Sequence, residues 1–140
     1  FATADVLTID LWKGKSALDK LGAAASWLMS RGKLTRLTGD SLPLGILEDV
    51  AEEGTAFKLA AGDAVVLMTD GVEDAFSGVQ ALETAVRAAL ACSSPQRAAE
   101  SILASALDAG GGERRDDQSA LVVYIRSAAE AALQSAEADV

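Results

Sequence analysis

The sequence contains no histidine and a single cysteine, and each scarcity excludes a kind of site. Without histidine, this chain by itself cannot form a Ser-His-Asp triad, a Cys-His pair or a histidine-ligated zinc site. The lone Cys92 cannot form an internal disulfide or a CxxC pair, which is consistent with a reducing compartment. Carboxylates are therefore the ligands that this chain can offer to a metal ion.

Long apolar runs and an excess of basic charge are also lacking. No stretch approaches the roughly 18 to 20 apolar residues of a membrane span, and the opening FATAD lacks the basic segment of a signal peptide. Lys and Arg number 12 against 21 Asp and Glu, a formal net charge of -9. Binding to nucleic acid or to anionic lipid depends on Lys and Arg side chains that neutralise the phosphates. We therefore expect no nucleic-acid partner, no direct membrane contact and a cytoplasmic location for this portion.

The apolar residues make up half of the 140 positions, enough for one domain, or part of one, with a sizeable core. Alternating and β-branched patterns predict strands. The run AVVLM is apolar throughout, which is typical of a strand covered on both faces. The predicted strands cover residues 2–11, 16–21, 34–37, 55–59, 64–68 and 120–125.

Helical periodicity predicts two helices between residues 77 and 109. The first is expected to begin with a capping box made by Ser77 and Gln80. The second is expected to begin at Ser94, followed by Pro95, and to end at the glycines 110–112.

Two further stretches have no clear period. Residues 39–54 predict an irregular connection that is held to the core by its apolar residues, namely Leu42, Leu44, Ile46 and Leu47. Residues 127–140 are rich in Ala and Glu. Glu137 and Asp139 near the C-terminal end oppose a helix dipole, so we expect a frayed helical or disordered tail.

Acidic residues stand at the ends of two predicted strands. Asp70 and Gly71 follow AVVLM directly, and Asp116 and Asp117 precede the strand at residue 120. A strand end holds a side chain rigidly, and carboxylate oxygen is the ligand that Mg²⁺ and Mn²⁺ prefer. A pair of such ions could activate water and stabilise charge on a phosphoryl group. An ordinary Asp-Gly turn and a solvated Asp pair are the alternatives.

Five segments resemble a known family. TDGVEDA (69–75) and DDQSALVV (116–123) resemble the last two metal motifs of the protein phosphatase 2C superfamily. The opening ATADVLTIDLWKGK, KLGAAASWL (20–28) and SLPLGIL (41–47) are similar to the stage II sporulation protein E branch of that superfamily. Their order and spacing agree, and the resemblance covers residues 1–126.

The resemblance implies a fold and an activity. The family fold is α+β, a β-sandwich flanked by helices in an αββα arrangement, of which residues 1–126 would be the C-terminal portion. The implied activity is hydrolysis of phosphoserine or phosphothreonine on a protein, with two Mn²⁺ or Mg²⁺ ions. In this branch the implied partner is a phosphorylated anti-anti-sigma factor, whose dephosphorylation activates a sporulation sigma factor.

Position by position, the resemblance assigns roles to four residues. Asp70 and Asp116 match metal ligands of the family. Gly71 and Asp117 fall at the neighbouring positions and are expected to hold the loops in shape.

Positive charge beside these residues is a candidate for contact with phosphate. Arg114 and Arg115 could meet a phosphorylated substrate. Alternatively, they balance the charge of the Asp pair. The segment CSSPQR (92–97) has four residues between Cys and Arg rather than the five of a cysteine-phosphatase loop, so Cys92 is expected to be an ordinary small apolar residue.

The family's first metal motif, an early Asp-Gly, has no match in this sequence. We therefore expect this chain to be inactive alone. In relatives of this branch membrane helices lie upstream, so a membrane-anchored parent is implied. A sheet that lacks its first strands leaves an open edge, so we also expect self-association as a homodimer. Two alternatives remain open, namely a non-catalytic phosphatase fold that docks a sigma-factor regulator and a stress-response phosphatase of the same superfamily.

Overall fold

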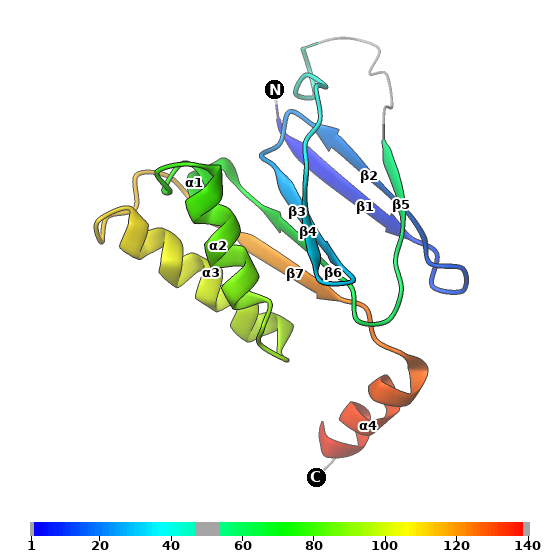
Figure 1. Ribbon diagram of the computed structural model, residues 1–140. Coiled ribbons are helices and arrows are strands. Elements are labelled where there is room, and N and C mark those ends of the chain that lie inside the picture. The colour runs from blue at the N-terminus through cyan, green and yellow to red at the C-terminus, as the bar shows by residue number, and fades with distance from the viewer. Residues whose placement is uncertain (1, 47–53, 139–140) are drawn as a thin grey trace.

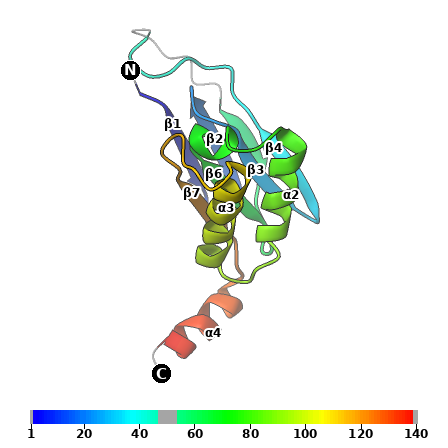
Figure 2. The same cartoon turned by 90° about the vertical axis from the view of Figure 1, so that its left-hand side faces the viewer.

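Two antiparallel β-sheets lie face to face, and helices cover one of them (Figures 1 and 2). The computed structural model describes residues 2–46 and 54–138. The strands are β1 (Ala4–Ile9), β2 (Lys15–Leu21), β3 (Ser26–Ser30), β4 (Lys33–Leu37), β5 (Thr55–Lys58), β6 (Ala64–Met68) and β7 (Ala120–Tyr124). The helices are α1 (Asp70–Glu73), α2 (Val79–Ala89), α3 (Pro95–Ala109) and α4 (Ala128–Ala138).

The strand order is β1-β2-β5 in one sheet and β4-β3-β6-β7 in the other. β6, the AVVLM strand, lies between β3 and β7, and Val65 and Val66 are fully buried. The prediction of a strand covered on both faces is therefore confirmed. β3 lies on a stretch where no strand was expected, because SWLMS has neither the alternation nor the β-branched residues that predict a strand.

Helices α2 and α3 pack on the four-stranded sheet, on the side away from β1-β2-β5 (Figure 2). The predicted second helix is confirmed, because the Ser94 hydroxyl caps α3 by accepting from the N–H of Arg97 at 3.3 Å. The predicted capping box of the first helix is wrong, because α2 begins after Gly78 with no side-chain cap. The main core cluster joins this sheet to the helices, and its largest members are Trp27, Leu34, Val66, Met68, Val72, Leu82, Val86, Ile102 and Val122.

Residues 41–46 lie on the surface, so the expectation that their apolar side chains hold them to the core is wrong. Leu42, Leu44 and Ile46 are 49%, 37% and 48% exposed, and Leu47 lies outside the described residues. Backbone contacts anchor the segment instead. Leu44 exchanges two hydrogen bonds with Ala2, of 2.8 and 3.0 Å, in an isolated antiparallel bridge.

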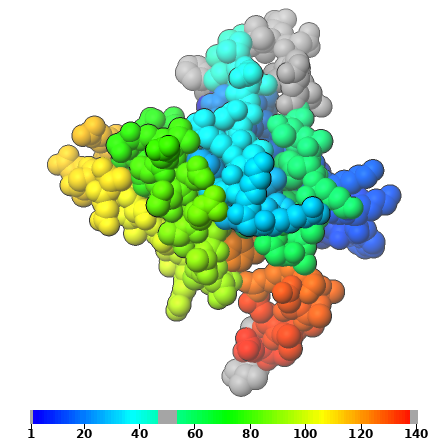
Figure 3. All heavy atoms as spheres, in the orientation of Figure 1, coloured from blue at the N-terminus to red at the C-terminus, as the bar shows by residue number. Residues whose placement is uncertain are grey.

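Helix α4 projects from the body of the molecule (Figures 1 and 3). Residues 128–137 are all exposed. Ser127 and Glu130 form a capping box, in which each side chain accepts a hydrogen bond from the other's backbone N–H. The Ser127 N–H and the Ser127 hydroxyl both donate to Glu130 Oε2, and these two bonds lower the pKa of Glu130, the backbone bond most. Fraying of residues 127–140 stays a prediction.

No helix among the described residues has the length and apolar character needed to span a bilayer.

A buried ion pair within the β1-β2-β5 sheet is joined to the other sheet through the Ser26 hydroxyl. Lys20 Nζ on β2 lies 2.7 Å from Asp5 Oδ1 on β1 and donates to Ser26 Oγ on β3 at 2.9 Å. The Ser26 hydroxyl also donates to Asp5 at 3.1 Å. The side chains of Lys20 and Asp5 are only 3% and 10% exposed. Removing one charge would leave the other unpaired in a poorly solvated place.

We predict that Asp5→Ala lowers the free energy of unfolding by about 3 to 5 kcal/mol, because the Lys20 ammonium is left buried without an opposite charge, with only the Ser26 hydroxyl as its partner. The double variant Asp5→Ala/Lys20→Met should recover most of that loss, since neither charge remains. Urea unfolding of the three proteins measures the difference. A loss for Asp5→Ala below about 1 kcal/mol would contradict the role of this pair.

Tyr124 provides a second, pH-dependent contribution to stability. Its hydroxyl donates to the carbonyl oxygen of Cys92 at 2.5 Å. Burial raises the pKa of Tyr124 above its ordinary value of 10.0, with the Cys92 thiol acting in the same direction and Arg126 against it. The neutral phenol is thus favoured in the folded state. Its contribution is complete below pH 10.0 and is lost as the pH rises through the raised pKa.

We predict that Tyr124→Phe lowers the free energy of unfolding by about 1 kcal/mol at neutral pH, through loss of one hydrogen bond. The gap between the two proteins should narrow above the ordinary pKa of tyrosine. Unfolding curves at neutral and alkaline pH test this, and phenolate absorbance reports the pKa directly because Tyr124 is the sole tyrosine. A gap that stays constant with pH would argue against the assignment.

Candidate metal centre

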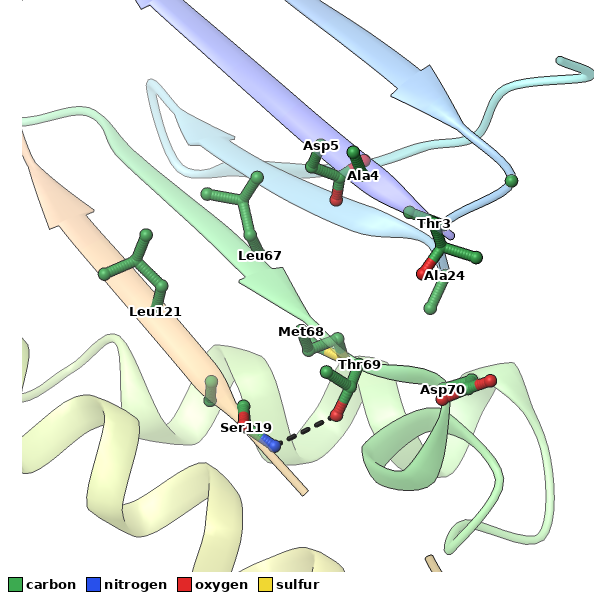
Figure 4. Close-up of a pocket in the computed structure, with 13 residues that line it drawn as sticks. Thr3, Ala4, Asp5, Ala24, Leu67, Met68, Thr69, Asp70, Ser119 and Leu121 are labelled. Carbon is green, nitrogen blue, oxygen red and sulfur yellow. Dashed lines mark hydrogen bonds between the residues drawn. The ribbon is translucent and has the colours of Figure 1, made fainter. Parts of the chain in front are cut away.

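The two acidic motifs meet because β6 and β7 are antiparallel neighbours. Met68 at the end of β6 pairs with Ala120 at the start of β7. The residues after the first strand therefore lie beside those that precede the second. Figure 4 shows this junction, with Asp70 beyond the end of β6.

Four hydrogen bonds join the two motifs. Thr69 donates its backbone N–H to Ser119 O at 3.1 Å and accepts from the Ser119 N–H on its hydroxyl oxygen at 3.0 Å (dashed in Figure 4). The Thr69 hydroxyl donates to Asp117 O at 3.1 Å. The Gln118 side-chain amide donates to Gly71 O at 3.0 Å. Backbone and side-chain contacts thus hold residues 69–71 against residues 117–119.

Gly71 makes the closest approach between the motifs. A Cβ atom built on Gly71 would lie 2.3 Å from Asp117 O and 3.2 Å from Asp116 Cβ. The first distance is far below van der Waals contact with a backbone atom that cannot rotate away. Residue 71 must be glycine for the two loops to pack in this way.

Asp70 and Asp116 have the same local geometry. In each, Oδ1 accepts from the backbone N–H of the following residue, at 3.0 Å in Asp70 and 2.7 Å in Asp116. Both residues are exposed, and no further hydrogen bond to either side chain is found in the described part of the chain. Each carboxylate therefore keeps Oδ2 available to an outside ligand.

The two carboxylates border different cavities. Asp70 lines one of about 290 Å³, together with Asp5 of β1, whereas Asp116 lines one of about 370 Å³, together with Arg115 and Gln118. Within residues 2–46 and 54–138, no three acidic or cysteine side chains are placed to hold a metal ion. The convergence of Asp70 and Asp116 on one ion stays a prediction.

The donor chemistry fits a hard divalent cation in part. Asp70 and Asp116 offer exposed carboxylate oxygens from adjoining, well-fixed loops, which suits Mn²⁺ or Mg²⁺. Two carboxylates are fewer than the ligands such ions take, so the other positions would be filled by water or by groups beyond the described residues.

The two arginines lie in the loop before β7. Arg114 and Arg115 are exposed, and Arg115 borders the same cavity as Asp116. The ion pairs found among the described residues include neither arginine. Contact with phosphate and charge balance of the Asp pair both stay predictions for these two residues.

Two residues that hold the site were not singled out from the sequence, namely Glu73 and Gln118. Glu73 on α1 accepts the backbone N–H of Ala25 at 3.1 Å and pairs with Arg36 of β4. Their partners are 37 to 48 residues away along the chain, so no local pattern could reveal them.

The family comparison agrees with this geometry. A family model described as stage II sporulation protein E matches residues 1–126, which include every segment of the site. The chain belongs to the stage II sporulation protein E family. Stage II sporulation protein E of Bacillus subtilis (strain 168) is 24% identical over 128 residues, covering 89% of this chain and 16% of that protein.

Solved structures of phosphatase domains share the fold. The PP2C phosphatase domain of SpoIIE from Bacillus subtilis, solved with a fragment of its regulatory domain, superposes with a TM-score of 0.75 at 24% identity, covering 88% of this chain and 37% of that one. The catalytic domain of PstP, a serine/threonine phosphatase of Mycobacterium tuberculosis solved with two manganese ions, gives 0.70 at 21% identity, covering 89% and 59%.

The chain thus has the PP2C phosphatase fold predicted from its motifs, and it spans about a sixth of the Bacillus subtilis family member. Of the two helical layers in the expected αββα arrangement, the described residues supply the one on the four-stranded sheet.

We predict that Gly71→Ala lowers the free energy of unfolding by about 1 to 3 kcal/mol, because the added methyl group collides with the backbone of Asp117. Amide NMR signals of residues 69–71 and 116–119 should shift together, while those of α4 stay in place. Shifts confined to residue 71 and its chain neighbours would show that the loops are not in contact.

Proposed function

We propose that this chain forms the C-terminal, metal-binding part of a Mn²⁺- or Mg²⁺-dependent protein serine phosphatase. The observation that carries the proposal is the packing of Gly71 on Asp117, which brings the two acidic motifs together at the β6–β7 junction. Family membership over residues 1–126 supports the same assignment. The substrate class is a phosphorylated anti-anti-sigma factor, and its dephosphorylation would activate a sporulation sigma factor.

In this proposal the chain's own residues have distinct roles. Asp70 and Asp116 each contribute a carboxylate oxygen to divalent metal, while the neighbouring N–H groups fix the rotation of both side chains. This chain has a net charge of -9, and Arg114 and Arg115 supply the local positive charge that a substrate's phosphorylated serine requires. Bound divalent ions would activate water for attack on phosphorus. The remaining ligands would come from the part of the family's domain that this chain does not span.

A non-catalytic docking module is the second candidate. The observation that favours it is that the described residues place no three acidic groups around a common point. Such a module would keep the fold and lose metal affinity. Metal binding therefore separates the two candidates.

We predict that Asp70→Asn weakens Mn²⁺ binding at least about tenfold, because an amide oxygen carries no charge and binds a hard cation poorly. Binding to this chain is measured as the Mn²⁺ concentration that half-broadens the Gly71 amide NMR signal. Phosphate release from a phosphorylated anti-anti-sigma factor by the full-length protein that carries this sequence should fall in parallel. Glu83→Gln, which removes an exposed charge from α2, is the matched control and should behave as wild type.

Equal Mn²⁺ response of wild type and Asp70→Asn, with equal phosphatase activity, would remove the phosphatase proposal. Absence of both metal binding and activity in the wild-type full-length protein would establish the docking module in its place.

A further inference from the structure

Helix α1, which carries Asp70, is too short to hold its own shape. It has four residues, and its one i→i−4 bond runs from Asp74 N to Asp70 O at 2.8 Å. Isolated helices of this length do not persist in water. The Asp70 side chain makes no hydrogen bond to another element in the described part of the chain. The Gly71 N–H fixes the Asp70 side chain relative to α1, so contacts made by other residues of α1 must set the direction of the helix and, with it, of this carboxylate.

One side of α1 is held by the loop before β7. The Gln118 amide reaches Gly71 O, and Gly71 packs on Asp117. Val72, the next residue, is fully buried in the core. These contacts fix the first half of α1.

The other side of α1 is held by Glu73. One carboxylate oxygen accepts the Ala25 N–H at 3.1 Å, and the other pairs with the Arg36 guanidinium. Ala25 directly precedes β3, and Arg36 lies on β4. The Glu73 side chain is 24% exposed, so this charge-assisted pair is partly shielded from water. Among the described residues, Glu73 is the one side chain of α1 that hydrogen-bonds to the β2–β3 loop or to β4.

The loop that Glu73 contacts is itself held in place. Gly22 has φ +66°, and a Cβ there would lie 2.5 Å from the Pro43 ring. The Gly22 N–H also donates to Ser41 O at 3.1 Å. A chain of contacts thus joins three of the family-like segments. Pro43 of SLPLGIL packs on Gly22 of KLGAAASWL, and Ala25 of the same segment hydrogen-bonds to Glu73 of TDGVEDA.

We propose that Glu73 is a positioning residue for the metal ligand Asp70, an inference that rests on the proposed phosphatase function. Glu73 lies three residues after Asp70, one turn along the same short helix. Its carboxylate holds that turn against β3 and β4 while Gln118 and Asp117 hold the opposite side. Loss of Glu73 frees α1 to rotate, and the Asp70 carboxylate loses its fixed direction towards a cation.

The test measures Mn²⁺-induced broadening of the Gly71 amide NMR signal in this 140-residue chain, together with the thermal unfolding midpoint. Glu73→Ala should need about tenfold more Mn²⁺ for half-broadening, which is the usual effect of losing a group that orients a ligand. Glu73→Gln should show a smaller rise, because its amide oxygen still accepts the Ala25 N–H. Arg36→Gln, which removes only the ion pair, should also show a smaller rise.

Asp74→Asn is the matched control for charge. Asp74 is the next residue, is exposed, and makes no side-chain hydrogen bond in the described part of the chain. Asp74 borders the cavity that Asp116 also lines, so its loss measures the effect of removing one negative charge near the site without releasing α1. Because an exposed charge is well screened, the Mn²⁺ requirement should change by less than about threefold.

The outcomes separate this inference from the proposed function. If Asp70→Asn raises the Mn²⁺ requirement and Glu73→Ala does not, Glu73 has no positioning role and the phosphatase proposal stands. A lower unfolding midpoint with an unchanged Mn²⁺ response assigns Glu73 to stability alone and also overturns the inference. Equal effects of Glu73→Ala and Asp74→Asn mean that charge, not position, is responsible. If Glu73→Ala does not fold, the other two variants decide. The inference is overturned when Glu73→Gln and Arg36→Gln need no more Mn²⁺ for half-broadening than the wild type. If Asp70→Asn needs the same Mn²⁺ concentration for half-broadening as the wild type, the proposed function itself is removed.

Discussion

The antiparallel pairing of β6 with β7 decides where the acidic residues of this chain lie. Residues 68 and 120 are 52 positions apart in the chain, yet they are cross-strand partners at one end of the sheet. β6 is stable there because both of its faces are covered, one by the helices and the other by the β1-β2-β5 sheet. A buried strand has few ways to shift its register, since a slip of one residue would turn the core side chains to the wrong face. The two acidic loops inherit that fixed register.

The short helix α1 shows how a fold can hold a residue that local structure cannot. Three of its residues each contact a different part of the molecule. Gly71 contacts the loop before β7, Val72 the core and Glu73 the β2–β3 loop. Each contact is small, and none of the three is made by the side chain of Asp70 itself. Together they fix the backbone of one turn from several directions. A ligand on such a turn is pre-oriented although its own side chain is exposed.

Much of the fold could be predicted because strong local patterns agree with the tertiary environment. AVVLM, the Ser94-Pro95 helix start and the glycine stop after α3 were all readable. The failures occur where the pattern was absent or the contact distant. β3 has no alternation and no β-branched residue. Leu42, Leu44 and Ile46 were expected to be buried, but backbone pairing with Ala2 holds that segment and leaves them outside.

The sequence by itself determined the family, the acidic strand ends and the exclusion of histidine chemistry, because residue identity and spacing carry that information directly. Only the tertiary structure decided that Gly71 packs on Asp117 and that Glu73 hydrogen-bonds to Ala25 and pairs with Arg36. It also decided that Asp70 and Asp116 border separate cavities. These facts depend on side-chain directions and on distances between segments far apart in the chain. A local pattern constrains neither, because packing selects among many arrangements that have the same periodicity.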